Sequence, residues 1–168
     1  MDAAGLQREL ERCHRHAYTW ALHCCRWRPE NAEDVLQTAY LKVLDGRARF
    51  DGRSSFQTWL FAVIRRTAVD DQRWSFRRRH WAEPLTEDVA EAVGESGIGE
   101  GDAALAEALQ RLSDRQREVL LLVFYHELSV EDAAAVMGIG VGSARTHSAR
   151  GKERLKQMLQ RREDLDDA

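Results

Sequence analysis

Apolar residues recur at intervals of three and four along most of this 168-residue chain, which is the spacing of amphipathic helices. Strand-like alternation is not evident, and only two prolines interrupt the pattern. The spacing predicts helices over residues 6–27, 31–45, 55–79, 113–124, 130–137 and 141–156. The chain is therefore predicted to be all-α, with three or four helices in each half.

Local signals place several helix ends in the first half. Asn31 is a favoured N-cap residue with Asp34 at its third position, and Gly46 is a favourable stop for that helix. The turn at residues 50–55 carries an Asp-Gly pair, and one of its two serines is expected to cap the next helix.

The second half contains two short helices joined by a glycine-bearing turn. Ser129 is a plausible N-cap with Asp132 three positions on, and Gly138 ends the first helix. The second helix, residues 141–156, carries a strongly basic face. The pattern is typical of a helix-turn-helix, whose second helix enters the major groove of DNA, although an ordinary helical hairpin would also produce it.

The net charge is only −3, but the charges are segregated. Residues 47–79 hold nine arginines and three aspartates, and residues 141–162 hold seven lysines or arginines and one glutamate. Between them, residues 82–110 hold eight acidic residues and no basic one. This distribution predicts two small helical domains, residues 1–80 and 105–168, joined by a flexible acidic linker at residues 81–104.

Aromatic and basic residues are interleaved along the predicted third helix and just beyond it. The aromatic residues are Trp59, Trp74, Phe76 and Trp81, and the arginines are Arg65, Arg66, Arg73, Arg77, Arg78 and Arg79. Because arginine neutralises phosphates and an exposed ring stacks on an unpaired base, the combination favours melted or single-stranded DNA. Trp59 is equally compatible with a place in the core.

The cysteines are Cys13, Cys24 and Cys25, with three histidines, His14, His16 and His23, nearby. An odd number without a secretory signal argues against a disulfide framework, and no CxxC or HxxxH pair supplies metal-site spacing. We expect plain packing and no metal or cofactor, with redox or metal sensing as the alternative hypothesis. No run of 18 apolar residues and no signal peptide are evident, which predicts a cytoplasmic protein.

Three segments resemble, in order, those of bacterial sigma factors of the extracytoplasmic-function class, the minimal sigma-70 type with two conserved domains. They are Ala32–Tyr40 (AEDVLQTAY), Phe50–Leu60 (FDGRSSFQTWL) and Leu112–Leu120 (LSDRQREVL), the last followed by the helix-turn-helix. The resemblance runs from about residue 6 to about residue 158. It implies a protein without catalytic activity that directs RNA polymerase to promoters and assists in melting them.

The resemblance also implies roles for individual residues. Those matching the family's contacts with core polymerase are Asp34, Gln37 and Leu41. Those matching its contacts with the minus-ten element are Asp51, Gly52, Arg53, Ser54, Ser55, Trp59, Arg65, Arg66 and Arg73. Those expected to bind the minus-thirty-five element are Ser143, Arg145, Thr146, His147, Arg150 and Lys152. The turn at 51–55 resembles the loop that holds a base flipped out of the minus-ten element.

Core RNA polymerase and promoter DNA are the partners that the resemblance implies. An anti-sigma factor that covers the polymerase-binding faces is expected as well, and insertion into a membrane is not. The linker resembles the segment that threads the RNA-exit path of the polymerase, where acidic charge mimics nucleic acid.

Four residues depart from the family's pattern. Arg66 stands where asparagine is frequent, which affects the choice of minus-ten bases. Ala144 and Ser148 replace larger apolar residues on the inner face of the recognition helix. Gly151 lowers the stability of that helix by about 1 kcal/mol relative to alanine at the same position. The last three predict either a looser second domain or unusual packing within it.

Two other functions fit part of the sequence. A free-standing helix-turn-helix regulator leaves the basic-aromatic helix and the Asp34 and Gln37 pair unexplained, and no dimerisation stripe is evident. An enzyme or metal sensor built on the cysteines and histidines lacks a ligand spacing, a phosphate loop and a nucleophile constellation. The sequence therefore favours the sigma factor.

Overall fold

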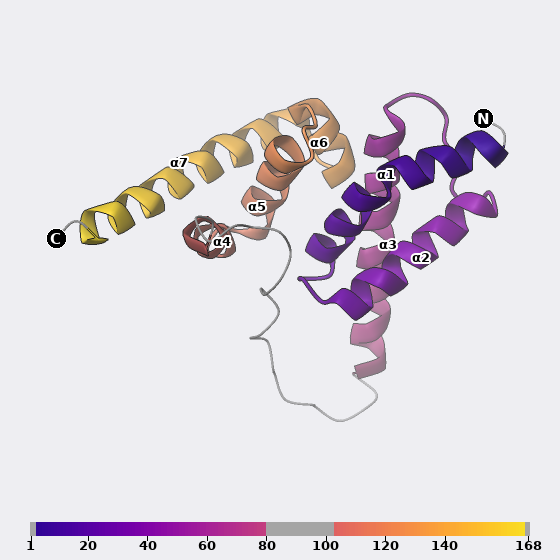
Figure 1. Ribbon diagram of the computed structural model, residues 1–168, viewed down its shortest axis with the longest axis horizontal. Helices are drawn as coiled ribbons and strands as arrows, with labels where there is room; N and C mark the ends of the chain where they lie inside the picture. The colour runs from indigo at the N-terminus through magenta and orange to yellow at the C-terminus, as the bar shows by residue number, and fades with distance from the viewer. Residues whose placement is uncertain (1–2, 80–102, 167–168) are drawn as a thin grey trace. The chain divides into compact units, whose positions relative to one another are not determined.

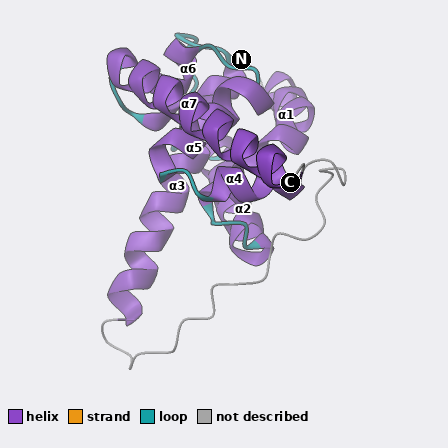
Figure 2. Ribbon diagram, turned by 90° about the vertical axis from the view of Figure 1, so that its left-hand side faces the viewer, coloured by secondary structure: helices purple, strands orange, loops and turns teal. Residues whose placement is uncertain are grey.

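The computed structural model describes residues 3–79 and 103–166 and contains helices but no strand within those ranges (Figure 1, Figure 2). Two compact units are present. Unit 1 consists of α1 (Ala3–Cys24), α2 (Pro29–Leu44) and α3 (Phe56–Arg79). Unit 2 consists of α4 (Ala103–Gln110), α5 (Asp114–Leu120), the π-helical turn η2 (Leu121–Tyr125), α6 (Val130–Met137) and α7 (Val141–Asp166). The all-α prediction is confirmed; Trp81 and the predicted linker up to residue 102 lie outside the described residues.

In unit 1 each helix contacts the other two around Trp20, which is fully buried. The Trp20 indole N–H donates to the carbonyl oxygen of Phe61 at 3.0 Å, and the two rings stack with centroids 5.6 Å apart. A buried indole with its N–H satisfied contributes a large apolar surface at no cost in unpaired polar groups. The apolar stripe predicted on α2 is buried against this core and comprises Val35, Leu36, Ala39 and Val43.

The predicted boundary between α1 and α2 is wrong by a few residues. α1 ends at Cys24 instead of residue 27, because Arg26 and Trp27 adopt left-handed backbone angles with φ of 54° and 59°. α2 then begins at Pro29, so Asn31 lies within the first turn and is not the N-cap. Proline suits the first helical position because its φ is already helical and no N–H needs a partner there.

The starts of α3 and α6 follow the prediction. The Ser55 hydroxyl accepts the backbone N–H of Thr58 at 3.1 Å, which identifies Ser55 as the cap of α3. The Ser129 hydroxyl accepts the N–H of Asp132 at 3.0 Å and donates to the Asp132 carboxylate at 2.7 Å. Gly138, with φ of 65°, ends α6 in the left-handed conformation.

In unit 2, α5 and α7 approach closely at Gly151. A Cβ atom at Gly151 would lie 3.1 Å from Leu120 Cδ1 and 3.3 Å from Gln116 Cβ. Ala144 and Ser148 are buried on the same face of α7. The small residues that depart from the family's pattern therefore accompany a tight helix contact. Of the two alternatives that the sequence left open, a looser domain or unusual packing, this contact agrees with the second.

The segment that follows α5 is a π-helical turn, where the sequence predicted regular helix through Phe124. The His126 N–H binds the Leu121 carbonyl at 3.0 Å, a pairing across five residues. Leu122 is buried, whereas Phe124 and Tyr125 are 61% and 48% exposed. The wider turn thus places two aromatic rings outside the core just before the helix-turn-helix.

Candidate protein and nucleic-acid interfaces

One exposed stripe follows α2 on the side opposite its buried residues. Asp34, Gln37 and Leu41 are all exposed, and their spacing of three and four places them along one face. Leu44 extends the stripe, and the two leucines are 53% and 58% exposed. Exposed leucines beside polar residues mark a surface suited to a protein partner. Leu44 was missed in the sequence, although its position three residues after Leu41 was an available signal.

The turn before α3 is exposed and internally bonded. The Asp51 carboxylate accepts the Arg53 backbone N–H at 3.2 Å and pairs with the Arg53 guanidinium at 3.2 Å. Gly52 has φ of 74°, a conformation that side-chain-bearing residues adopt at a cost. Ser54 is partly exposed, and its hydroxyl donates to the Ser55 carbonyl at 3.2 Å. These bonds all lie within the turn itself.

Three aromatic rings form the base of this turn. The Trp59 ring centroid lies 5.4 Å from that of Phe50 and 5.3 Å from that of Phe56. Phe56 is buried, whereas Trp59 and Phe50 remain partly exposed. The sequence left open whether Trp59 lies in the core or contacts DNA. The structure is compatible with both, because Trp59 packs against the core and also presents part of its ring to the surface.

The middle of α3 presents arginines along one face, with the exposed Asp70 between Arg66 and Arg73. Arg66 and Arg73 are exposed and Arg65 is partly exposed. Trp59, Arg66 and Arg73 follow one another at intervals of seven residues and so share one side of the helix. The Gln72 side chain donates to the Cys24 carbonyl at 2.9 Å, which ties this part of α3 to the end of α1. The side chains of Trp74, Phe76, Arg77, Arg78 and Arg79 lie outside the described part of the chain.

The predicted recognition residues spread over the outer side of α7. Ser143, Arg145, Thr146, Arg150 and Lys152 are exposed, whereas His147 is partly buried. The Arg145 guanidinium donates to the Glu131 carboxylate at 2.7 Å, and the Lys152 ammonium lies 5.7 Å from the Phe124 ring centroid. Arg150 borders an open groove of about 980 Å³ that Arg111 and Arg154 also line. The structure thus brings five of the six residues to the surface of a single helix.

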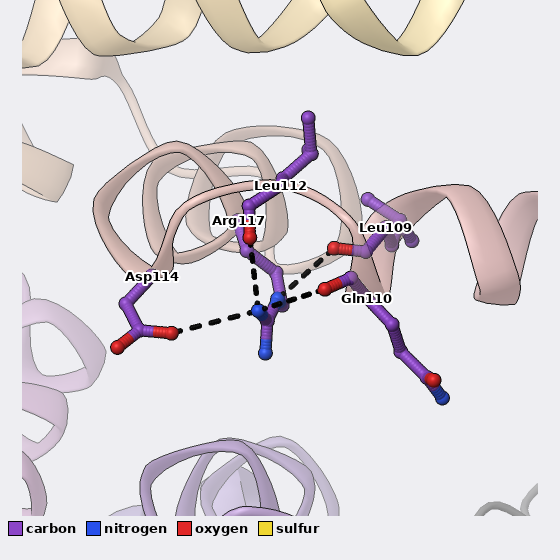
Figure 3. Close-up of polar contacts among 5 residues, drawn as sticks. All are labelled: Leu109, Gln110, Leu112, Asp114 and Arg117. Carbon is purple, nitrogen blue, oxygen red and sulfur yellow. Dashed lines mark hydrogen bonds and ion pairs between the residues drawn. The ribbon is translucent and has the colours of Figure 1, made fainter. Parts of the chain in front are cut away.

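Arg117 holds together the helices that support the recognition helix, and sequence reasoning gave it no role. Its guanidinium donates to the carbonyl oxygens of Leu109 at 3.0 Å, Gln110 at 3.3 Å and Leu112 at 3.0 Å (Figure 3). It also lies 3.5 Å from the Asp114 carboxylate. Helix ends leave carbonyl groups without helical partners, and Arg117 binds the carbonyls of Leu109 and Gln110 at the end of α4, the first of which also accepts the Leu112 N–H at 3.2 Å. It thereby fixes the turn between α4 and α5.

The three thiols are free. Cys13 and Cys25 are buried and Cys24 is partly exposed, and burial raises the pKa of Cys25 to about 11. A buried thiol of raised pKa is almost wholly protonated at neutral pH and is a poor nucleophile. Within the described ranges, no group of three or more acidic, histidine or cysteine side chains could hold a metal ion. No helix there is both long and apolar enough to cross a bilayer.

Comparison with known proteins identifies the family. The models for Sigma-70 region 2 and for Sigma-70, region 4 match residues 10–82 and 102–155. RNA polymerase sigma factor YlaC of Bacillus subtilis (strain 168) is 30% identical over 137 residues, or 77% of this chain and 78% of YlaC. ECF RNA polymerase sigma factor SigC of Mycobacterium tuberculosis (strain CDC 1551 / Oshkosh) is 34% identical over 130 residues, or 74% of this chain and 68% of SigC.

A solved structure gives the same answer. The sigma factor RpoE of Bartonella quintana, in complex with the anti-sigma factor NepR, is similar with a TM-score of 0.74 at 26% identity, over 92% of this chain and 96% of that one. The chain therefore belongs to the sigma-70 family, in its extracytoplasmic-function (ECF) class. Its function is to direct RNA polymerase to promoters, and its relatives are sigma factors, which are not enzymes.

Proposed function

We propose that residues 1–80 bind core polymerase and the melted minus-ten element, and that residues 105–168 bind the minus-thirty-five duplex. One observation carries the assignment of residues 1–80, and the exposure of five of the six predicted recognition residues on α7 supports that of residues 105–168. On unit 1, the stripe on α2 exposes an acid, an amide and two leucines, whereas α3 exposes arginines, part of Trp59 and two aspartates, Asp70 and Asp71. The side chains of α2 suit contact with a protein, and those of α3 suit contact with single-stranded DNA. Polymerase and the minus-ten strand would therefore bind to different helices.

The turn at 51–55 is the proposed seat of a flipped minus-ten base. Extruding a base costs a few kcal/mol of stacking and pairing, and stacking on an aromatic ring returns about 1–3 kcal/mol. Trp59 lies at the base of the turn, and Arg66 and Arg73 continue along the same face toward the strand's phosphates. Binding energy of this kind stabilises open promoter DNA without any catalytic step, which supports a factor that is not an enzyme.

An anti-sigma factor is the proposed regulator, and it would cover the stripe on α2. The exposed leucines of that stripe support the proposal, as does the likeness to RpoE, whose solved structure contains NepR. The site of action would be the cytoplasm, where core polymerase and the chromosome are found.

Transcription in vitro with bacterial core polymerase on a library of promoter fragments tests the proposal. The protein should support run-off transcription, and Asp34→Ala combined with Gln37→Ala should abolish it by weakening polymerase binding. The matched control is Gln7→Ala combined with Glu11→Ala, an exposed amide and acid on α1 that bind each other at 2.9 Å. Equal transcription by both double variants would remove α2 from the proposal.

A second pair of variants separates DNA contact from polymerase contact. Arg66→Ala combined with Arg73→Ala should leave polymerase binding intact but reduce permanganate reactivity of the minus-ten thymines. Arg8→Ala combined with Arg15→Ala removes two exposed arginines of α1 and should leave reactivity unchanged. Binding to duplex DNA without any engagement of core polymerase would instead favour the free-standing regulator.

A further inference from the structure

The recognition helix presents Arg145 already engaged by a carboxylate. Arg145 Nη2 lies 2.7 Å from Glu131 Oε1, and the two side chains are 68% and 56% exposed. Glu131 lies in the first turn of α6, so the pair joins the two helices of the helix-turn-helix. An ion pair this exposed adds little to folding stability. Its effect therefore lies in where it holds the guanidinium.

The pair changes what Arg145 can attract. A hydrogen bond from its own backbone N–H and the Arg145 guanidinium both lower the pKa of Glu131, so the carboxylate stays ionised. A phosphate that approaches Arg145 then meets a neighbouring negative charge, whereas the O6 and N7 acceptors of guanine carry no net charge. A guanidinium has five N–H donors, so binding to Glu131 leaves donors for a base edge.

Arg150 provides the contrast on the same helix. It is exposed and forms no ion pair with any residue that the structure describes. Glu153 lines the same groove as Arg150, but no ion pair joins the two side chains. An arginine that no carboxylate engages is suited to the phosphates of any sequence. Arg145 and Arg150 thus differ in their electrostatic surroundings, a distinction that the sequence alone left open.

We infer that Glu131 is a specificity-determining positioning residue, which directs Arg145 toward a guanine in the major groove and away from the DNA backbone. The inference rests on the proposed binding of α7 to the minus-thirty-five element. It assigns base reading to Arg145 and backbone contact to Arg150. Glu131 itself needs no contact with DNA.

The test uses the full chain with core polymerase and a promoter recovered by the transcription experiment, with each minus-thirty-five base pair varied in turn. In Glu131→Gln, discrimination at one G·C position should fall by roughly 5- to 100-fold, the range for a lost bidentate contact. Binding to mismatched fragments should strengthen, and the slope of log affinity against log salt should steepen by about 0.9 as Arg145 gains a phosphate.

Glu127→Gln is the matched control, because it removes one exposed carboxylate charge from the same unit and Glu127 forms no ion pair among the described residues. It should keep both the base preference and the salt slope of the wild type. Arg145→Gln should lose preference at the same base pair as Glu131→Gln, and the double variant should lose no more than Arg145→Gln. A merely destabilised protein would show a lower Tm with unchanged base preference.

If Glu131→Gln has the same base preference and the same salt slope as Glu127→Gln, the inference is overturned, and the proposed function still stands. The same holds if Arg145→Gln keeps full preference at every position. A wild-type holoenzyme that shows no minus-thirty-five preference at all would instead remove the proposed role of α7, and the inference with it.

Discussion

Arg117 is a side chain that connects α5 to the end of α4 in unit 2. It is mostly buried, with 22% of its side chain exposed, and it donates to three main-chain carbonyls at the end of α4 and in the turn that follows it. Lysine could not replace it, because an ammonium group carries its donors on one atom and lacks the planar fork of a guanidinium.

Arg117→Met is expected to lower the free energy of unfolding of unit 2 by about 2 kcal/mol, since charge-assisted hydrogen bonds to three carbonyls are lost. Arg111→Met is the control. Its ion pair with Glu107, at 2.7 Å, is largely exposed and should contribute less than about 1 kcal/mol. Urea unfolding followed by circular dichroism measures both, and equal losses would contradict the role of Arg117.

Two partly or fully buried groups, Tyr40 and Cys25, predict how the stability of unit 1 responds to alkaline pH. Burial raises the pKa of Cys25 to about 11 and that of Tyr40 to about 12, above the ordinary values of 9.0 and 10.0. A raised pKa in the folded state means that stability is full below the ordinary value and is lost as pH rises through the raised one. Unit 1 should therefore keep constant stability from pH 7 to 9 and lose it progressively up to pH 12.

Urea unfolding at pH 7, 9, 10.5 and 11.5 tests this dependence. Tyr40→Phe should remove the part of the decline that tyrosine ionisation causes, while leaving the part that begins nearer pH 9. A stability that rises above pH 9 would contradict the assignment of both groups to a desolvated environment.

The contact between α5 and α7 shows why a residue that weakens a helix in isolation can strengthen a helix pair. Gly151 lacks the side chain that would meet Leu120 and Gln116, and Gly142 of the same helix has open space at its Cβ position. Replacing each glycine with alanine in turn therefore separates the effect of helix propensity on stability from the effect of packing.

Gly142→Ala is expected to stabilise unit 2 by up to about 1 kcal/mol, the propensity gain of alanine over glycine. Gly151→Ala should show no such gain and should destabilise, because the added carbon lies within 3.3 Å of the Gln116 Cβ, which cannot move without α5. Thermal unfolding of both variants is the measurement. A similar rise in Tm for both would mean that the helices separate readily at this point.

Signals confined to a few consecutive residues made most of the helices predictable. Ser55, Ser129 and Gly138 act through neighbours within a turn, so the sequence displays them directly. Asn31 failed as a cap because a competing local signal, Pro29, prevailed. Arg117 and Glu131 act on a preceding or neighbouring helix, at separations that no helical periodicity reveals.

The candidate surfaces were predictable to the extent that the family's motifs are local. The stripe of Asp34, Gln37 and Leu41 is exposed as expected, whereas His147 is partly buried on α7. Exposure on a helix depends on which face the neighbouring helices cover, and in unit 2 the face of α7 that carries Gly151 packs against α5. Spacing alone carries no information on that contact.

Each unit of the chain encloses a core of its own, around Trp20 in unit 1 and around residues such as Val119 and Leu122 in unit 2. Calorimetry of the full chain should therefore resolve two thermal transitions. Arg117→Met should lower only one of them, and Trp20→Leu, which empties part of the other core, should lower only the other. One transition that both variants shift equally would mean that the units unfold together.

The π turn at Leu121–Tyr125 sets the rotational phase at which the chain leaves α5 for the loop that leads into α6. Its hydrogen bond spans five residues, one more than the hydrogen bond of an α-helix. Each residue of an α-helix corresponds to a rotation of about 100°. Deleting a single residue there would repair the regular hydrogen bonding and yet swing the helix-turn-helix away from the face of α5 that Gly151 contacts. In an alignment of relatives, a one-residue gap in this segment would thus mark a reoriented recognition helix, even where the residues of α7 are identical.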